Sequence, residues 1–581
     1  MKNFFIGLVV GVLFSGLVLF ILVFAAVRLA GSLAGSFGAT RPASVPDSAM
    51  LVLKLDGDLP ENAPPEIPLP FFEAQNPLAI HDVWEIFHRA ASDSRIKGIV
   101  LEPRGLSTGF AKLQEVQQEV AQFKKSGKPI VTFLRSPTAR EYYLASATDR
   151  IFLGPEDGLD LKGMRVESIF LKSGLDKIGV HMDVIHAGKY KDAGDMFTRT
   201  DMSPETREVL NGVLEQYYGN LIDVVAQGRR KQSDEIRAVV DQGPFVAGEA
   251  LTRGLVDQLG YEDQAIENLK NRANNSNLGR VTAKTYLKAP RSGSAAPNRI
   301  ALVIGQGEII SGTGNESAND RDFTSTGFVK LLRQVENDSS IKGVILRIDS
   351  PGGDGIASDE ILHEAKNLSK KKPTVISMSD LAASGGYYVS VTGDPIVAYP
   401  NTLTGSIGVL FVRPNLHGLY DKLGVGKQQL SRGRYAELDS EYVPLDDDAR
   451  RKLTSEVDDF YKVFVTRVAQ GRKSSFDQIE PLAQGRVWTG TQAKQNGLVD
   501  ELGGLDRALE LVKQKAHIGA GERVTLVPFP GKRSVFDVLV SRSEDLSDVE
   551  LRIKKIIGQV PISALMRGGF LKLMPYSIQV K

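Results

Sequence analysis

The sequence predicts an α/β protein: two tandem repeats of mainly parallel sheet with flanking helices, preceded by one transmembrane helix. Short apolar segments such as 129–134 and 373–378 alternate with longer amphipathic segments, as is typical of parallel sheets covered by helices. The segment "IKGIVLEP" at 96–103 returns as "IKGVILRI" at 341–348, which indicates a duplication with an offset of 245 residues. Residues 4–27 carry no charge, and a helix of that length, about 36 Å, could cross a hydrocarbon core of about 30 Å.

Two stretches rich in small residues, Gly, Ser and Pro separate these parts and are typical of linkers. The duplicated blocks extend to "GPFVAGEALTRGLVDQLG" at 243–260, which matches "GRVWTGTQAKQNGLVDELG" at 485–503 after a small change in offset. The predicted parts are an N-terminal anchor (1–28), a linker (29–49), the first repeat (50–287), a second linker (288–299), the second repeat (300–520) and a C-terminal extension (521–581). Within the extension, residues 547–557 predict an amphipathic helix.

Composition excludes several classes of site. The formal net charge of +1 gives no overall basic field for nucleic acid, so no nucleic-acid partner is expected. The chain has no cysteine, which rules out disulfides, thiolate metal sites and cysteine nucleophiles, and is consistent with an oxidising compartment. We expect no metal site and no cofactor. Basic residues on both sides of the apolar segment leave its orientation open.

The two repeats differ in a complementary way at two positions. Aligning the tyrosine pairs of "PTAREYYLAS" and "DLAASGGYYVS" places Ala139 opposite Ser384. Aligning Tyr190 of "HAGKYKDAG" with Tyr435 of "LSRGRYAEL" places Lys191 opposite Ala436, and 52 residues separate the two candidate positions in each repeat. The second repeat therefore keeps a possible nucleophile, and the first keeps a possible base. This pattern predicts an active site divided between the repeats.

A serine nucleophile needs a base, and histidine is the usual one. None of the seven histidines lies in a recognisable block with an acid, so we expect structural or surface roles for His81, His88, His181, His186, His363, His417 and His517. A lysine can act instead when burial lowers its pKa, because a low dielectric disfavours the ammonium form. Lys191 follows a strand-like segment and is the candidate base.

Glycine-rich loops in the second repeat predict an oxyanion hole. Gly385 and its neighbour follow Ser384, and "SPGGDG" at 350–355 offers Gly353 at the end of another predicted strand. Backbone amides at such strand ends can stabilise a tetrahedral oxyanion. In "TLTGSIGV" at 402–409, Ser406 is a hydroxyl that could hold a neutral lysine, and the first repeat has Leu161 there.

These motifs together resemble signal peptide peptidase A in its long, two-repeat bacterial form, over about residues 50–515 and the N-terminal anchor. The resemblance implies a serine–lysine protease of the Clp-protease/crotonase superfold that cuts signal peptides and other apolar peptides by acyl-enzyme hydrolysis. It also implies anchorage in the bacterial inner membrane, a periplasmic catalytic body and a homotetramer. Carried over to this chain, Ser384 is the nucleophile, Lys191 the general base and Ser406 its orienting hydroxyl, with the amides of Gly353 and Gly385 at the oxyanion.

Two other functions remain open at this point. A crotonase-like acyl-CoA enzyme would use similar amides but typically needs a carboxylate pair. A silent membrane-tethered scaffold would predict erosion of both repeats, whereas the losses here are complementary, so a protease is favoured. Whether Ser384 and Lys191 meet within one chain or across a subunit boundary stays open, and we expect one chain.

Overall fold

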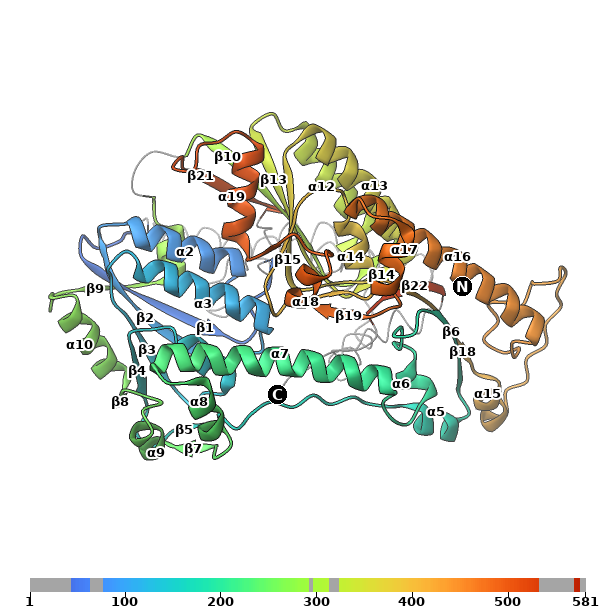
Figure 1. Cartoon of the computed structure of the whole chain (residues 1–581), viewed down its shortest axis with the longest axis horizontal. Coiled ribbons are helices and arrows are strands. Elements are labelled where there is room, and N and C mark those ends of the chain that lie inside the picture. Colours follow the sequence, from blue (N-terminus) through green and yellow to red (C-terminus); the bar gives the residue numbers. More distant parts are fainter. Residues whose placement is uncertain (1–42, 63–76, 292–295, 313–322, 532–568, 575–581) are drawn as a thin grey trace, which may run out of the picture.

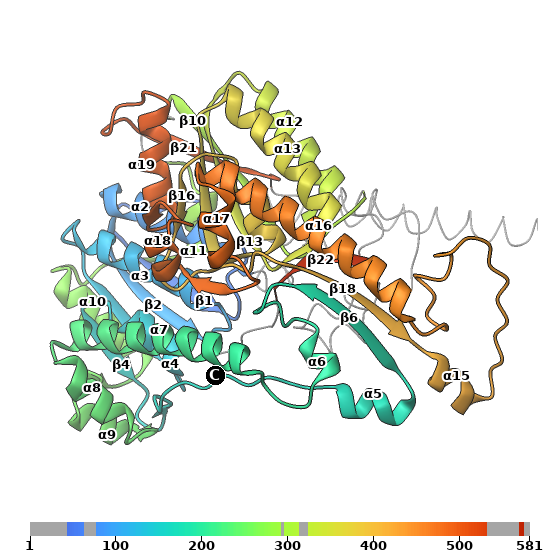
Figure 2. The ribbon, with the colours of Figure 1, turned by 45° about the vertical axis from the view of Figure 1, so that its right-hand side comes forward.

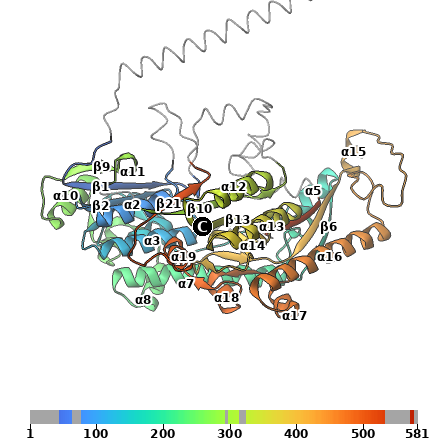
Figure 3. The same cartoon turned by 90° about the horizontal axis from the view of Figure 1, so that it is seen from above.

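The computed structural model describes residues 43–62, 77–291, 296–312, 323–531 and 569–574 (Figure 1). The expected anchor (1–28) and the expected helix at 547–557 lie outside these residues. Among the helices that are described, none is long and apolar enough to cross a membrane. Seen from above, β1 (Ala49–Asp56), β2 (Ile96–Arg104) and α10 (Glu262–Arg272) of the first repeat lie at one end of the molecule (Figure 3). At the other end, α5 (Lys172–Ile178) and β6 (His181–Ala187) of the first repeat lie near α15 (His417–Leu423) of the second.

The first repeat forms a six-stranded sheet in the order β8-β4-β3-β2-β1-β9, in which every neighbouring pair is parallel. Its strands are β1 (Ala49–Asp56), β2 (Ile96–Arg104), β3 (Ile130–Leu134), β4 (Arg150–Leu153), β8 (Gln258–Leu259) and β9 (Gly279–Thr282). A separate antiparallel pair joins β5 (Gly158–Leu159) to β7 (Phe245–Val246). The inner strands are buried along almost their whole length, which explains their continuous apolar sequences.

The second repeat has the same parallel strand order, β20-β16-β15-β13-β10-β21. Two further strands extend this sheet, with β17 beside β15 and β19 antiparallel to β17. The strands are β10 (Asn298–Gln306), β13 (Ile341–Ser350), β15 (Thr374–Ala383), β16 (Ile396–Ala398), β17 (Leu403–Gly405), β19 (Val487–Thr489), β20 (Glu501–Leu502) and β21 (Val524–Phe529). The α/β class, the mostly parallel sheets and the duplication are thereby confirmed.

A third sheet contains strands from both repeats, in the order β12-β11-β14-β22-β18-β6. Its strands are β6 (His181–Ala187), β11 (Ile309–Ile310), β12 (Phe323–Thr324), β14 (Gly352–Asp354), β18 (Val409–Asn415) and β22 (Gly569–Leu573). Strand β6 of the first repeat runs antiparallel along the whole of β18 of the second (Figure 2). The first repeat thus contributes a strand to a sheet of the second.

Helices cover the sheets in both repeats. The first repeat has α2 (Ile80–Ser92), α3 (Phe110–Lys124), α4 (Ala139–Ala145), α5 (Lys172–Ile178), α6 (Asp195–Thr198), α7 (Pro204–Arg229), α8 (Ser233–Val240), α9 (Ala247–Thr252), α10 (Glu262–Arg272) and α11 (Ala283–Lys288). The second has α12 (Ser325–Asn337), α13 (Gly355–Lys371), α14 (Gly385–Ser390), α15 (His417–Leu423), α16 (Asp447–Arg472), α17 (Phe476–Ile479), a 3₁₀ turn (Glu480–Leu482), α18 (Gly490–Gln495) and α19 (Leu505–Lys515).

The long helices α7 and α16 show how closely the repeats correspond. Each has 26 residues and begins after a side-chain N-cap, Ser203 for α7 and Asp446 for α16. Near the C-terminus of each helix, an arginine forms a paired ion contact with an aspartate, Arg229 with Asp257 at 2.9 Å and Arg472 with Asp500 at 2.6 Å.

Buried charges join the two repeats. Arg347 on β13 is fully buried, and its guanidinium donates to Glu61 at 3.0 Å and to Glu115 on α3. Lys112 on α3 pairs with Asp349 at 2.8 Å, and its backbone N–H donates to Asp380 on β15 at 2.9 Å. Asp380 of the second repeat therefore accepts a hydrogen bond from an amide in the first turn of α3, which belongs to the first repeat.

The chain beyond residue 520 contributes two strands that the sequence did not indicate. β21 pairs with β10 and takes the position in the second sheet that β9 has in the first. β22 pairs antiparallel with β14 on one side and with β18 on the other.

Candidate active site

Ser384 lies at the turn between β15 and α14, where it is the N-cap of the helix. Its φ of +54° is unusual for a residue other than glycine, and its N–H donates to the Gly405 carbonyl at 2.8 Å. Such a strand-to-helix turn holds the serine side chain at the carboxyl end of the sheet, where α/β proteins build their sites. The left-handed residue of this turn is Ser384 itself, and the two glycines that follow it begin α14. They permit close packing rather than the turn, because a Cβ on Gly386 would lie 2.6 Å from the Ser350 carbonyl oxygen.

Lys191 enters the second repeat through β6. Because β6 pairs with β18, the loop after β6 lies against the loops that follow β17 and the 3₁₀ turn. The backbone on either side of this contact is fixed: the Tyr190 N–H donates to the Gln484 carbonyl at 2.7 Å, and the Lys191 N–H donates to the Gly188 carbonyl at 3.1 Å. The lysine is therefore positioned by strand pairing between the repeats.

The structure brings together the three side chains that the sequence singled out, within a single chain. Lys191 Nζ lies 2.9 Å from Ser384 Oγ and 3.0 Å from both the hydroxyl and the carbonyl oxygen of Ser406. Ser384 and Ser406 are fully buried, and Lys191 is 1% exposed. A neutral amine has two N–H donors and one lone pair, so it could donate twice to Ser406 and accept the Ser384 O–H.

Burial decides the charge of this lysine. The loss of solvation holds the pKa of Lys191 well below its usual value, and the neighbouring Asp192 opposes that shift only in part. Asp192 is itself mostly buried, which raises its pKa to about 7, while a hydrogen bond from Thr206 acts in the opposite direction. The site therefore favours an uncharged amine next to the Ser384 hydroxyl.

Two glycines make room for the lysine. A Cβ on Gly485 would lie 2.6 Å from the Cβ of Lys191, and a Cβ on Gly408 would lie 3.0 Å from its Cδ. Gly485 also has a φ of +76°, which favours glycine. Gly408 lies in the segment 402–409 that the sequence singled out for Ser406, whereas Gly485 was missed, and its only signal was its place at the start of a block shared by both repeats.

The glycines expected to supply oxyanion amides are neighbours in space. A Cβ placed on Gly385 would lie 3.2 Å from the backbone nitrogen of Gly353. Gly353 has a φ of +151°, and a Cβ there would come within 2.1 Å of the Ile309 carbonyl oxygen. The N–H of Gly352 donates to Ser350 Oγ at 3.1 Å, so it is already engaged. β14 therefore brings Gly353 next to the start of α14, and no other residue type fits its backbone there.

The aligned positions of the opposite repeats form no second site. Ala139 begins α4, where Thr138 takes the capping position, and Leu161 is fully buried in the core of the first repeat. Ala436 lies in an exposed turn, because the segment equivalent to β6 in the second repeat, 426–432, is not a strand.

Comparison with known proteins agrees with this duplicated organisation. The profile of Peptidase family S49 matches the chain twice, at residues 122–276 and 366–519. The first match includes Lys191 and the second includes Ser384 and Ser406.

Relatives extend the similarity over most of the chain. "Serine protease SPPA, chloroplastic" from Arabidopsis thaliana is 35% identical over 494 residues, which are 84% of this chain and 73% of the relative. "Protease 4" from Haemophilus influenzae is 31% identical over 503 residues, 82% of this chain and 80% of the relative. "Protease 4" from Salmonella typhi is 32% identical over 456 residues, which are 75% of this chain and 72% of the relative.

A solved ClpP1 mutant structure from Listeria monocytogenes aligns with 36% of this chain and 94% of its own, at 17% identity and a TM-score of 0.23. At this TM-score the likeness carries no argument, and the expected Clp-protease/crotonase superfold stays a prediction. The two profile matches, together with relatives that match most of the chain, show that the chain belongs to peptidase family S49 and is a serine protease.

Proposed function

We propose that Ser384 and Lys191 form a serine–lysine dyad, in which Ser384 is the nucleophile and Lys191 the general base. The observation that carries this proposal is the 2.9 Å distance between Lys191 Nζ and Ser384 Oγ, at a lysine whose burial lowers its pKa. Ser406 orients the amine by accepting two hydrogen bonds from it. The amides of Gly353 and Gly385 stabilise the oxyanion.

The reaction is acyl transfer to the serine, followed by hydrolysis. Neutral Lys191 takes the Ser384 proton as Oγ bonds to the carbonyl carbon of the peptide. The tetrahedral oxyanion collapses, the C–N bond breaks, and the lysine ammonium gives its proton to the leaving amine. Water then attacks the acyl-enzyme, its proton passes to Lys191, and breaking of the C–Oγ bond returns a proton to Ser384.

The substrate is proposed to be an extended apolar peptide, with cleaved signal peptides as the principal class. Strand β22 supports an extended binding mode, because it lies between β14 and β18 with Lys572 opposite Gly353. A peptide in the same place would bond to both strands through its main chain, and this mode of recognition tolerates varied sequences. Buried Leu410 and Val412 on β18 provide apolar surroundings beside it.

Membrane anchorage is part of the same proposal. The uncharged residues 4–27 would hold the protein in the bacterial inner membrane, with the catalytic body on the periplasmic side. Anchorage to the lipid bilayer would place the dyad near signal peptides that remain in the membrane after cleavage. The absence of cysteine is consistent with such a compartment.

A homotetramer is proposed from the internal symmetry of the chain. Strand β6 of the first repeat pairs with β18 of the second. The equivalent segments, 426–432 in the second repeat and 164–170 in the first, are not strands of the described structure. Large apolar side chains are exposed in and beside them: Ile169, Ile178, Leu423, Val425 and Leu430. Pairing of 426–432 with 164–170 of the next copy would repeat the internal contact and close a ring.

The oligomer can be tested by light scattering of the full chain in detergent. Leu430→Glu alters a side chain that is 97% exposed, and we expect this variant to be smaller than the wild-type assembly. Val463→Glu, at another exposed apolar position on α16, is the matched control and should leave the size unchanged. An unchanged assembly for Leu430→Glu would contradict the proposed contact.

The dyad can be tested by cleavage of a synthetic signal peptide, followed by mass spectrometry. Ser384→Ala and Lys191→Ala should each abolish hydrolysis while the chain stays folded. Lys189→Ala is the control, because Lys189 lies two residues away with its side chain 61% exposed. Full activity of either dyad variant would overturn the assignment.

A further inference from the structure

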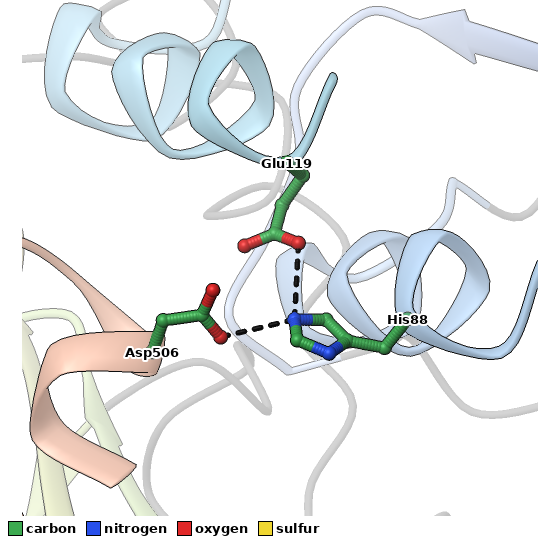
Figure 4. A group of neighbouring side chains, drawn as sticks. All are labelled: His88, Glu119 and Asp506. Atoms are coloured by element: carbon green, nitrogen blue, oxygen red, sulfur yellow. Dashed lines mark ion pairs between the residues drawn. The ribbon is translucent and has the colours of Figure 1, made fainter. Parts of the chain in front are cut away.

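Three side chains from three helices converge where the two repeats meet (Figure 4). His88 comes from α2 and Glu119 from α3, both in the first repeat, and Asp506 comes from the first turn of α19 in the second. Glu119 Oε2 lies 3.2 Å and Asp506 Oδ1 lies 3.0 Å from the same atom, His88 Nε2. Figure 4 shows both carboxylates pointing toward that nitrogen.

Two of the three atoms that face one another have no hydrogen-bond partner. His88 Nε2 and Glu119 Oε2 are both buried without a partner at hydrogen-bond geometry, and Glu119 as a residue is 2% exposed. If the His88 imidazole were protonated and both carboxylates were charged, the group would still carry a net charge of −1. A divalent cation bound to a neutral imidazole and two carboxylates would bring the group to zero.

We propose that His88, Glu119 and Asp506 form a binding site for a divalent transition-metal cation, with Zn²⁺ as the reference ion. Imidazole nitrogen and carboxylate oxygen bind Zn²⁺ at about 2.0–2.2 Å, so two adjacent ligand atoms lie about 3.0–3.5 Å apart. The observed separations of 3.0 and 3.2 Å fall in this range. The three donors lie within 4.8 Å of one another, and among the described residues they form a group with the spacing needed to hold a metal ion.

Surrounding contacts orient two of the three ligands. Trp84 Nε1 donates to Asp506 Oδ1 at 2.7 Å, and the Trp84 ring lies 4.2 Å from the imidazole of His88. Supporting contacts of this kind commonly hold metal ligands in place. The side chain of His88 is 34% exposed, whereas its Nε2 atom is buried.

The position of the site gives the cation a structural role. It would connect α2 and α3 of the first repeat to α19 of the second, close to the Leu505 N–H that donates to Glu115 at 3.1 Å. Because each repeat supplies part of the candidate active site, a cation there would stabilise the docking on which that site depends. The sequence assigned His88 a structural or surface role because no histidine lies in a recognisable block with an acid. Glu119 and Asp506 lie 31 and 418 residues away from His88 along the chain, so no local motif joins them.

Zinc binding to the full chain tests the proposal, with no histidine tag and after removal of metals with a chelator. Isothermal titration with Zn²⁺ should show one binding site per chain. The affinity of that site for Zn²⁺ should fall at least tenfold in His88→Ala and in Glu119→Gln. His363→Ala is the control, because His363 shares an exposed hydrogen bond with Asn367, away from the proposed site, and its loss should leave the affinity unchanged. Wild-type affinity in His88→Ala, or no stoichiometric binding to the wild type, would overturn the site.

Cobalt provides a second measurement if a variant fails to fold. Co²⁺ added to the wild-type chain should produce visible d–d absorption that equimolar Zn²⁺ removes, and a spectrum identical to that of free Co²⁺ would refute the proposal. Neither measurement reads peptide hydrolysis, so failure of the metal site and failure of the dyad can be told apart.

Discussion

Gly485 and Lys191 approach so closely that a Cβ on Gly485 would lie 2.6 Å from the Cβ of the lysine. The two residues are 294 positions apart in the sequence and belong to different repeats. The position of the candidate base therefore depends on a glycine that has no reactive group of its own.

Gly485→Ala should reduce peptide hydrolysis by about a hundredfold or more, because displacing a catalytic group by about 1 Å can cost that much. The positive φ should also cost about 1–2 kcal/mol of stability. Gly497→Ala is a matched control, because Gly497 has a φ of +75° but no atom within 4 Å of the added Cβ. Initial rates and thermal unfolding of both variants separate the two effects. Equal losses of activity in both would show that backbone strain alone is responsible.

Lys191→Met should abolish hydrolysis, by at least about a thousandfold, and yet stabilise the folded chain near neutral pH. Burial lowers the pKa of Lys191 from the usual 10.5, so the unfolded chain binds a proton that the folded chain does not. Wild-type stability should then rise with pH from the lowered pKa up to about 10.5. The methionine variant should lose this dependence.

Urea unfolding at several pH values checks this prediction, with Lys189→Met as the exposed control. A Lys191→Met variant less stable than the wild type at pH 7, or one with the same pH dependence, would contradict a neutral buried lysine.

Asp192→Asn should move the acidic limb of the pH profile of kcat/KM to lower pH. The negative charge of Asp192 raises the pKa of Lys191, so its removal should lower that pKa further. Because burial raises the pKa of Asp192 to about 7, this charge is present mainly near and above neutral pH, and the shift should be seen in that part of the limb. Asp201→Asn, at an aspartate whose side chain is 74% exposed, serves as the control. A limb that stays in place or moves to higher pH would exclude Asp192 as a determinant of the charge on the lysine.

Much of this site was predictable because its signals are local or repeated. Ser384 and Gly385 share a motif, Gly353 and Ser406 lie in glycine-containing loops, and Lys191 was identified by comparing the repeats. Pairing of β6 with β18, and of β22 with β14 and β18, has no such signal, because a strand's partner in another repeat leaves no local pattern. Arg347 is a further example, since its counter-ions lie 286 and 232 residues away.

Arg347→Met should destabilise the chain by about 3–5 kcal/mol, because it leaves Glu61 and Glu115 buried without their counter-ion. Activity should fall with stability, since Arg347 lies on β13, which leads to β14 and Gly353. Adding Glu61→Gln and Glu115→Gln to Arg347→Met removes the unpaired charges and should recover part of the loss. Urea unfolding of the single and triple variants measures this, and a triple variant no more stable than Arg347→Met would contradict the explanation.

A chain that ends at residue 568 lacks β22 and should have a lower KM for short apolar peptides, with kcat unchanged. β22 bonds to β14 beside Gly353, so a substrate in the proposed extended position must compete with it, and a site occupied for part of the time lowers the apparent affinity. A chain that ends at residue 574 keeps β22 and is the control. Steady-state kinetics with one fluorogenic peptide distinguishes the outcomes. A fall in kcat without β22 would instead show that the strand supports the oxyanion loop, because only a structural contribution to Gly353 would slow the chemical step at saturating substrate.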